Sequence, residues 1–454
     1  MTKIREKDTF TQKLWAIVAP ITIQQLMLAL ISATDAVMLG LVDQESLSAV
    51  SLAGQVQFVY SMVIATAVEA GGVLVAQYWG ADDKPSVNEI LPIVLKVNLL
   101  AGGLTTLAAL LAPEQLMYIF TNQTELVERG GMYLRAVALS YFLFAVSQVY
   151  LCLLKNIGKA AVSSRISSLA VVLNIILNAV LIFGLFGAPR LGIVGAAYAT
   201  VISRLVELGL AIYENGRLEG VGVRWSYLSH RIQALEKPFF RFTATFLGAS
   251  VVWGVGSTMS SVVLGHMGSD AVAANSIASI VRTLLFCACR GLSCGAVVLV
   301  GNMLGSGNLE QAKTDAARLT RLSAVFGAAT AAVLVAITPA VTAAAPLEPT
   351  AAGYLKVMLL FNAVYVIGKS INCTVLNGVF AAGGDMKFDM QGNLIAMWCF
   401  TIPLGFLAAF QWKLPVLAVY CILNLDEIIK VPAVFLHYRR YIWLRDLTQK
   451  AEKF

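Results

Sequence analysis

Two apolar segments of this chain repeat each other along the sequence. The matching stretches are 37–40 with 262–265, 47–53 with 272–278, and 73–80 with 298–305. The offset stays at about 225 residues without a gap, and a duplicated apolar half is a common construction of secondary transporters, whose substrate path lies between the repeats. The repeat therefore predicts two similar halves and points to transport as a function class.

The composition places these halves in a membrane. The chain is 58% hydrophobic and 13% charged, whereas soluble domains carry about 25% charged residues. Apolar stretches of about 20 residues recur along its length, and each can cross a hydrocarbon layer of about 30 Å. Only helices and closed barrels satisfy the backbone in lipid, and the apolar stretches lack strict alternation. We therefore expect an all-α protein of the plasma or inner membrane.

Hydropathy predicts twelve membrane-spanning helices, six on each side of a polar linker. Their expected ranges are 14–40, 47–79, 90–112, 132–154, 162–186, 191–213, 238–265, 271–304, 318–338, 354–380, 390–411 and 414–437. An N-lobe at 1–213 is joined by the linker 214–237 to a C-lobe at 238–437, and a tail follows at 438–454. Because six is even, both lobes enter the membrane from the same side, so the repeats are parallel.

The charge pattern predicts the orientation of the chain. The formal net charge is +7, but Lys and Arg lie mainly in alternate loops, as in membrane proteins, with no basic helix that would suit nucleic acid. Basic clusters lie at 155–165, 313–321 and 439–445. These clusters predict that both termini and the linker face the cytoplasm.

The sequence argues against several other classes of protein. The seven cysteines lie in apolar segments without a C-x-x-C pair and partner histidines, so no metal or disulfide framework is expected. Residues 1–13 are polar, and the apolar run after them lacks a small-residue cleavage site, which argues against a cleaved signal. Three histidines are too few for a histidine cluster. We expect neither an enzyme nor a bound cofactor.

Asp35 is the main candidate for chemistry. It lies deep in the first predicted span, where an ionisable side chain is costly and by default functional. Pro20 precedes it by about four helical turns and can bend the helix. A carboxylate at this place can bind a proton or a hard cation such as Na⁺. The alternative is a shorter span with Asp35 at its outer rim.

Asn174 and Asn178 lie four residues apart and share one helix face. Their amides can offer oxygens to a cation or form hydrogen bonds between helices. Thr200 is a weaker candidate, at the end of the small-residue stretch 195–200. The small residues of this stretch predict close helix packing.

Other ionisable residues fall within predicted spans: Glu69, Lys96, Arg282, Arg290, Lys369, Asp426, Glu427 and Lys430. Glu427 and Lys430 are three residues apart and can pair with each other, so a structural role competes with a transport role. Asp426 has no such partner in the sequence and is the stronger functional candidate of the three.

The chain resembles the multidrug and toxic compound extrusion (MATE) family over nearly its whole length. The resemblance is carried by the spacing of Pro20 and Asp35 and by the stretches 35–40, 47–50, 76–81, 174–178, 181–184, 191–197 and 305–312. It implies a V-shaped pair of six-helix lobes around a cavity. It also implies export of organic cations and other amphipathic compounds in exchange for Na⁺ or H⁺, with a cation site at Asp35, Asn174, Asn178 and Thr200.

The chain departs from the family pattern in two places. Some members carry an aspartate at the position of Asn178, so Asp35 is the only carboxylate of this set. Related members often carry an Asn-Glu pair before the Trp-Gly of the seventh span, and 249–254 has no acid. The residue that corresponds to Asp35 in the second repeat is Ser260, which is not acidic either. The sequence therefore predicts coupling chemistry in the N-lobe.

We expect a cation-coupled antiporter that exports organic cations, drugs or amphipathic metabolites by alternating access, as a monomer among membrane lipids and without nucleic acid. The nearest alternative is a lipid or lipid-linked oligosaccharide flippase of the same superfamily, in which Arg282, Arg290, Lys369 and Lys430 would meet a diphosphate. An intramembrane glycosyltransferase would need a large extramembrane domain, and a channel would need a filter or a charged ring. The substrate and the choice between Na⁺ and H⁺ stay open.

Overall fold

The computed structural model describes residues 10–223, 225, 233–345 and 347–448, and all regular secondary structure in these ranges is helical. Parts of the predicted linker, with Arg224, His230 and Arg231, lie outside the described residues, as does the end of the predicted tail at 449–454. Eleven helices in the described ranges are long and apolar enough to cross a membrane.

The contacts within the chain divide it into two compact units. We call residues 23–243 the N-terminal unit, and residues 7–22 together with 244–453 the C-terminal unit. The boundaries fall inside two helices, between Thr22 and Ile23 and between Thr243 and Ala244. Pro20 therefore lies just before the point at which the first helix passes from one unit to the other.

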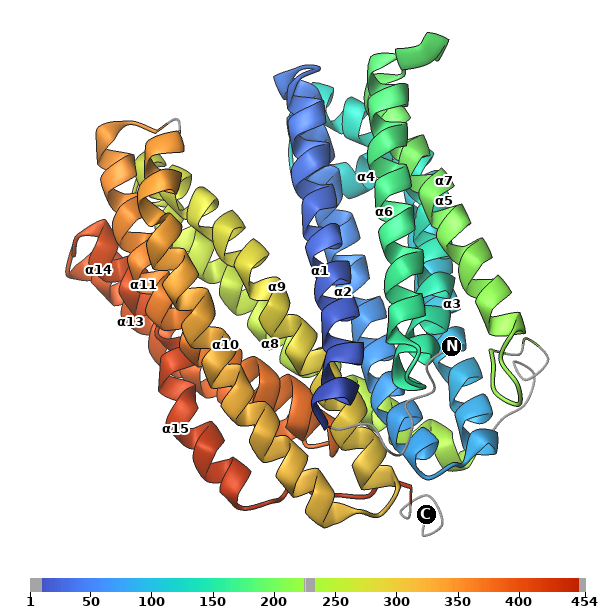
Figure 1. Cartoon of the computed structure of the whole chain (residues 1–454). Coiled ribbons are helices and arrows are strands. Elements are labelled where there is room, and N and C mark those ends of the chain that lie inside the picture. Colours follow the sequence, from blue (N-terminus) through green and yellow to red (C-terminus); the bar gives the residue numbers. More distant parts are fainter. Residues whose placement is uncertain (1–9, 224, 226–232, 346, 449–454) are drawn as a thin grey trace. The chain divides into compact units, whose positions relative to one another are not determined.

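The N-terminal unit is a bundle built around one central helix. Its helices are α1 (Phe10–Gly40, from Ile23), α2 (Gln44–Gly80), α3 (Lys84–Leu111), the short α4 (Pro113–Tyr118), α5 (Thr124–Asn156), α6 (Ala160–Phe183) and α7 (Gly192–Gly216). The central α5 packs on α2, α3 and α7, and α6 packs along α7. Figure 1 shows these helices in blue to green, and all but α4 are long and continuous.

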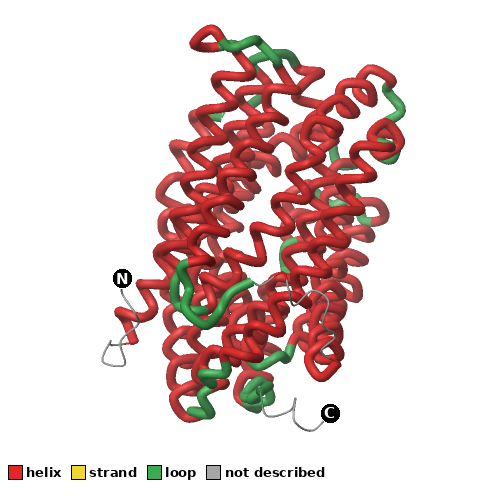
Figure 2. The backbone as a smooth tube through the Cα atoms, turned by 90° about the vertical axis from the view of Figure 1, so that its right-hand side faces the viewer, coloured by secondary structure: helices red, strands yellow, loops and turns green. Residues whose placement is uncertain are grey.

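The C-terminal unit repeats this order but its later helices are irregular. It contains α8 (Gln233–Gly265, from Ala244), α9 (Ser269–Gly305), α10 (Leu309–Ala344), α11 (Pro349–Thr374), the π-helical η3 (Val375–Phe380), α12 (Met386–Asn393), the π-helical η4 (Leu394–Thr401), α13 (Ile402–Phe406), the π-helical η5 (Leu407–Gln411), α14 (Val416–Leu423) and α15 (Asp426–Arg439). The central α11 packs on α9, α10 and α15. Figure 2 shows that helix dominates the described chain, with loops confined to short connections.

One predicted span is not a single helix. The range 414–437 is divided into α14 and α15, which are separated by Asn424 and Leu425. The Asn424 amide donates to the carbonyl of Tyr420 at 2.9 Å. Asparagine side chains compete in this way with regular helical hydrogen bonding. The expectation of one continuous last helix was therefore wrong.

Candidate functional site

The hairpin of α6 and α7 positions the polar residues of the N-terminal unit. Gly184 ends α6 with a φ of 74°, a left-handed conformation that glycine adopts easily. A Cβ atom on Gly195 of α7 would lie 2.6 Å from the carbonyl oxygen of Leu181, so the two helices touch at the backbone. The close packing predicted for 195–200 is confirmed.

The structure joins Asp35, Asn174, Asn178 and Thr200 in one chain of hydrogen bonds. The Asn178 amide donates to Asp35 Oδ1 at 2.6 Å and to Asn174 Oδ1 at 3.2 Å. The Asn174 amide in turn donates to Thr200 Oγ1 at 3.4 Å. Both asparagines are buried, at 4% and 0% exposure. A charged acceptor shortens such bonds, and the first contact is the shortest of the three.

A small cavity adjoins this chain inside the N-terminal unit. Its volume is about 60 Å³, room for about two water molecules. Asp35, Asn174 and Thr200 line it, together with Tyr133 and Ser167. The Oδ1 atom of Asn178 is buried and has no hydrogen-bond partner among the described residues. Carboxylate, amide and hydroxyl oxygens of this kind suit a hard cation, and the carboxylate alone suits a proton.

The same cavity is lined by a cation that sequence reasoning missed. Arg204 lies on α7, one turn after Thr200, and its Nη1 atom is 2.8 Å from Glu207 Oε2. Glu207 is 1% exposed and also accepts from Ser147 at 3.2 Å. The spacing of three residues was visible in the sequence, but the pair was not singled out. Because Arg204 and Glu207 neutralise each other, Asp35 stays the uncompensated charge of the cavity.

Two further candidates of the N-terminal unit lie elsewhere. Glu69 has an exposed side chain and does not line the cavity. Its helix α2 turns this position outward, and the sequence alone did not reveal the facing. Lys96 is half-buried on α3 and is likewise not among the cavity residues.

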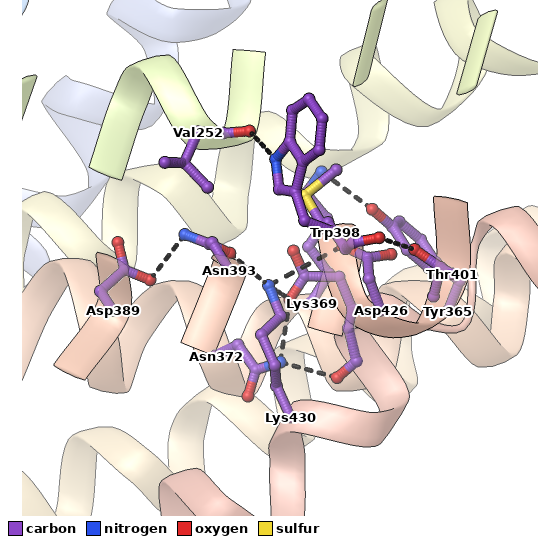
Figure 3. A network of polar contacts seen from close by, with 12 residues as sticks. Val252, Tyr365, Lys369, Asn372, Asp389, Asn393, Trp398, Thr401, Asp426 and Lys430 are labelled. Carbon is purple, nitrogen blue, oxygen red and sulfur yellow. Dashed lines mark hydrogen bonds and ion pairs between the residues drawn. The ribbon is translucent and has the colours of Figure 1, made fainter. Parts of the chain in front are cut away.

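Lys430 is the centre of a buried polar network in the C-terminal unit (Figure 3). Its Nζ atom lies 3.3 Å from Glu427 Oε2 and 3.8 Å from Asp426 Oδ2, and it donates to Asn393 Oδ1 at 2.8 Å. The Asn393 amide donates to Asp389 Oδ1 at 3.1 Å. All five side chains are less than 10% exposed. One buried cation is therefore surrounded by three acidic side chains.

This geometry corrects one prediction from the sequence. Asp426 was expected to lack a partner, but it shares Lys430 with Glu427, because residues three and four apart lie on one helix face. The residues of this network lie where regular α-helix is interrupted. The π-helical η4 begins directly after Asn393, and α15 begins at Asp426. π-Helical turns often occur at functional sites.

Two other predicted cations of this unit bind no carboxylate among the described residues. Arg282 Nη1 donates to Asn362 Oδ1 at 3.3 Å and to Asn424 Oδ1 at 3.2 Å. Lys369 Nζ donates to the hydroxyl of Tyr365 at 3.2 Å. Both therefore have neutral hydrogen-bond partners.

Comparisons with known proteins agree with one another. Residues 20–180 and 247–407 each match the MatE family model. The uncharacterized transporter YisQ of Bacillus subtilis is 20% identical over 98% of this chain and 97% of its own. The multidrug resistance protein PmpM of Pseudomonas aeruginosa is 24% identical over 87% of this chain and 83% of its own.

A solved structure shares the fold. It is described as the outward-facing conformation of a multidrug resistance MATE family transporter of the MOP superfamily. It matches with a TM-score of 0.87 at 19% identity, over 99% of this chain and 98% of its own. At this identity the likeness concerns the fold.

Proposed function

Since this chain belongs to the MatE family, the multidrug and toxic compound extrusion transporters, we propose that it exports drugs, organic cations or other amphipathic compounds in exchange for Na⁺ or H⁺. The observation that carries the coupling is the set of Asp35, Asn178, Asn174 and Thr200, which are linked by hydrogen bonds beside a small cavity. The export of drugs follows the relative PmpM, a multidrug resistance protein.

In the proposed mechanism Asp35 holds the exchanged cation. Asp35 is half-buried, and withdrawing a carboxylate from water without a counter-charge costs free energy. Arg204, which lines the same cavity, is paired with Glu207. An exchangeable Na⁺ or H⁺ supplies the missing charge. Asn174, Asn178 and Thr200 are the neutral ligands that Na⁺ would need in addition.

Pro20 is the proposed hinge through which cation binding acts on the substrate. It lies inside α1, on the same helix as Asp35, and it removes one backbone donor. A changed bend of α1 on cation binding would lower the affinity for the exported compound, and the compound would lower the affinity for the cation by the same factor. Alternation of these two states gives exchange.

Transport in proteoliposomes tests this proposal. The purified protein is reconstituted, and uptake of a panel of cationic dyes is measured under an imposed Na⁺ gradient and, separately, under a pH gradient. We expect one of the two gradients to drive dye movement and Asp35→Asn to abolish the effect. Dye movement that neither gradient changes would refute cation coupling.

The basic clusters lead us to propose that both termini face the cytoplasm. Single cysteines at Lys159 and Arg318, in a background without the seven native cysteines, should resist an impermeant thiol reagent in intact cells and react after lysis. Arg224, which lies outside the described residues, offers a third position. Reaction of two of the three in intact cells would reverse the orientation.

The alternative is a flippase for a lipid-linked oligosaccharide, and Arg282 and Lys369 are the features that favour it. Of the other two cations that would meet a diphosphate, Lys430 is paired with two carboxylates and the side chain of Arg290 is exposed. Movement of a fluorescent diphosphate lipid between leaflets, without any gradient, would favour this alternative over the antiporter.

A further inference from the structure

Arg282 and Lys369 place two positive charges on one aromatic ring. The guanidinium of Arg282 lies 5.2 Å from the centre of the Tyr365 ring, and the ammonium of Lys369 lies 5.3 Å from it. Two cations held by the same aromatic side chain raise the positive potential around it. No ion pair joins either cation to a carboxylate in the described part of the chain.

The nearby carboxylates are already engaged. Glu427 is held by Lys430 at 3.3 Å and by the Asn372 amide at 2.9 Å, and Asp426 is the second partner of Lys430. Both act on Lys369 electrostatically, but from beyond the distance of an ion pair. The network of Figure 3 thus concentrates its negative charge around Lys430.

A buried amide supplies a third donor beside Arg282. The Oδ1 atom of Asn362 accepts from Arg282 at 3.3 Å and from the Tyr420 hydroxyl at 3.1 Å, so its orientation is fixed by two donors. The Nδ2 atom of the same side chain is buried and has no hydrogen-bond partner in the described part of the chain, although Asn362 is 0% exposed. Buried donors without a partner are rare, and this one is suited to an incoming acceptor.

Aromatic rings complete the surroundings of Lys369. Its ammonium lies 5.2 Å from the Phe286 ring and 5.6 Å from the Trp253 ring. Trp253 is 39% exposed, whereas Phe286 is buried, so the cluster is open on the side of α8. An aromatic body of a ligand can pack on Trp253 while its polar end reaches the donors.

We propose that Arg282, Lys369 and the Asn362 amide bind the acidic group of an amphipathic aromatic compound, whose ring packs on Trp253. The inference rests on the proposed transport function and deepens it, because it adds organic acids and zwitterions to the exported compounds. An acidic group would accept from these donors and bring negative charge to the two cations. Charge-assisted hydrogen bonds of this kind are about twice as strong as neutral ones.

A matched pair of probes tests the site by binding alone. Naphthoate carries a carboxylate, and naphthamide has the same ring system with an uncharged amide. Equilibrium dialysis against the purified full-length protein in detergent gives both affinities. We expect naphthoate to bind about tenfold or more tightly than naphthamide, since hydrogen bonds to charged groups contribute about 1.5–3 kcal/mol. Equal affinities for the two probes would overturn the proposal.

Variants identify the residues responsible. Lys369→Met and Arg282→Gln should each weaken naphthoate binding about tenfold and leave naphthamide unchanged, while Lys369→Arg retains binding. Lys356→Met is the control, because Lys356 is exposed on the same helix α11. If Lys369→Met and Lys356→Met bind naphthoate alike, Lys369 has a structural role only. The wild-type comparison of probes decides the matter even if a variant fails to fold.

Two further measurements distinguish a failure of this inference from a failure of the proposed function. Pyrophosphate in place of naphthoate distinguishes a phosphate headgroup from an aromatic acid, and tighter binding of pyrophosphate would overturn the aromatic assignment. Binding needs neither Asp35 nor a gradient. Equal probe affinities with intact gradient-driven dye transport would therefore refute this inference alone, whereas selective naphthoate binding without any coupled transport would refute the proposed function alone.

Discussion

In the N-terminal unit one carboxylate, Asp35, receives a single amide donor from the unbroken helix α6, whereas in the C-terminal unit Asp426 and Glu427 share Lys430 where α14 gives way to α15. The first arrangement leaves a charge without a counter-charge beside a cavity. The second gives its two carboxylates one shared lysine. Two halves built from one repeat thus differ in the charge that surrounds their acidic residues, and the proposed function assigns the exchanged ion to the N-terminal unit.

The largest effect is expected from removing the charge of Asp35, which tests the contrast between the two units directly. Asp35→Asn keeps the size of the side chain and removes its charge, as permanent protonation would. We expect this variant to insert in the membrane but to lose gradient-driven dye efflux, down to the level of cells without the transporter. Asp426→Asn should retain most of the efflux, because Glu427 still pairs with Lys430. At matched membrane levels, normal efflux by Asp35→Asn and none by Asp426→Asn would move the coupling site to the other unit.

Removal of Lys430 should destabilise the C-terminal unit. Lys430→Met leaves Asp426 and Glu427 buried without their cation, and breaking a buried pair in this way costs about 3–5 kcal/mol. We expect a clear fall in the melting temperature of the purified protein. Adding Asp426→Asn and Glu427→Gln to Lys430→Met should recover part of it. A melting temperature equal to that of the wild type would mean that the network does not depend on Lys430.

Glu207→Gln sharpens the comparison within the N-terminal unit. The change frees Arg204, which lines the cavity of Asp35, so the arginine becomes a tethered competitor for the cation. We expect weaker cation coupling, seen as a higher Na⁺ or H⁺ concentration for half-maximal efflux, together with a stability loss of about 3 kcal/mol. The double variant Arg204→Leu with Glu207→Leu should restore the concentration dependence. An unchanged half-maximal concentration in Glu207→Gln would exclude Arg204 from the site.

A smaller effect is expected from Gly195→Ala. Its methyl group would meet the backbone of Leu181 at 2.6 Å and push α7 from α6, which separates Thr200 from Asn174. Overpacking of this kind costs about 1–3 kcal/mol, and we expect partial loss of efflux. Gly209→Ala is the matched control, because nothing lies within 4 Å of a Cβ atom there on the same helix. Equal efflux by both variants would show that the α6–α7 contact does not matter for coupling.

The smallest effect concerns the start of α2. Asp43 caps this helix, and the Ser46 backbone N–H donates to its carboxylate at 2.6 Å, while the corresponding cap of α9, Gly268, has no side chain. This bond, helped by Arg129, lowers the pKa of Asp43 from its ordinary value. Asp43→Ala should cost about 1 kcal/mol, seen as a lower melting temperature.

The pH dependence of that effect has a definite sign. A carboxyl group whose pKa is lowered on folding stabilises the protein above its unfolded pKa and loses this contribution as the pH falls through the folded value. The difference in melting temperature between the wild type and Asp43→Ala should therefore be full near neutral pH and shrink below about pH 4. A difference that persists in acid would mean that the cap does not act through its charge.

The sequence was sufficient for most of the helices, the duplication and some residues of the candidate site. Long apolar runs are a local property, so hydropathy located eleven spans, and the spacing of Asn174 and Asn178 placed both on one face of α6. The residue types alone also marked Asp35, because an ionisable group within an apolar run stands out without any knowledge of its neighbours.

Tertiary contacts decided the rest. The approach of Asn178 to Asp35, the facing of Arg204 into the cavity, and the convergence of Trp253, Phe286 and Tyr365 on Lys369 join residues from different helices. Helical periodicity states which residues share a face, but the direction of that face depends on packing between helices distant in sequence. For the same reason the sequence showed that Glu427 and Lys430 could pair, and only the fold showed which buried cations are left without a carboxylate.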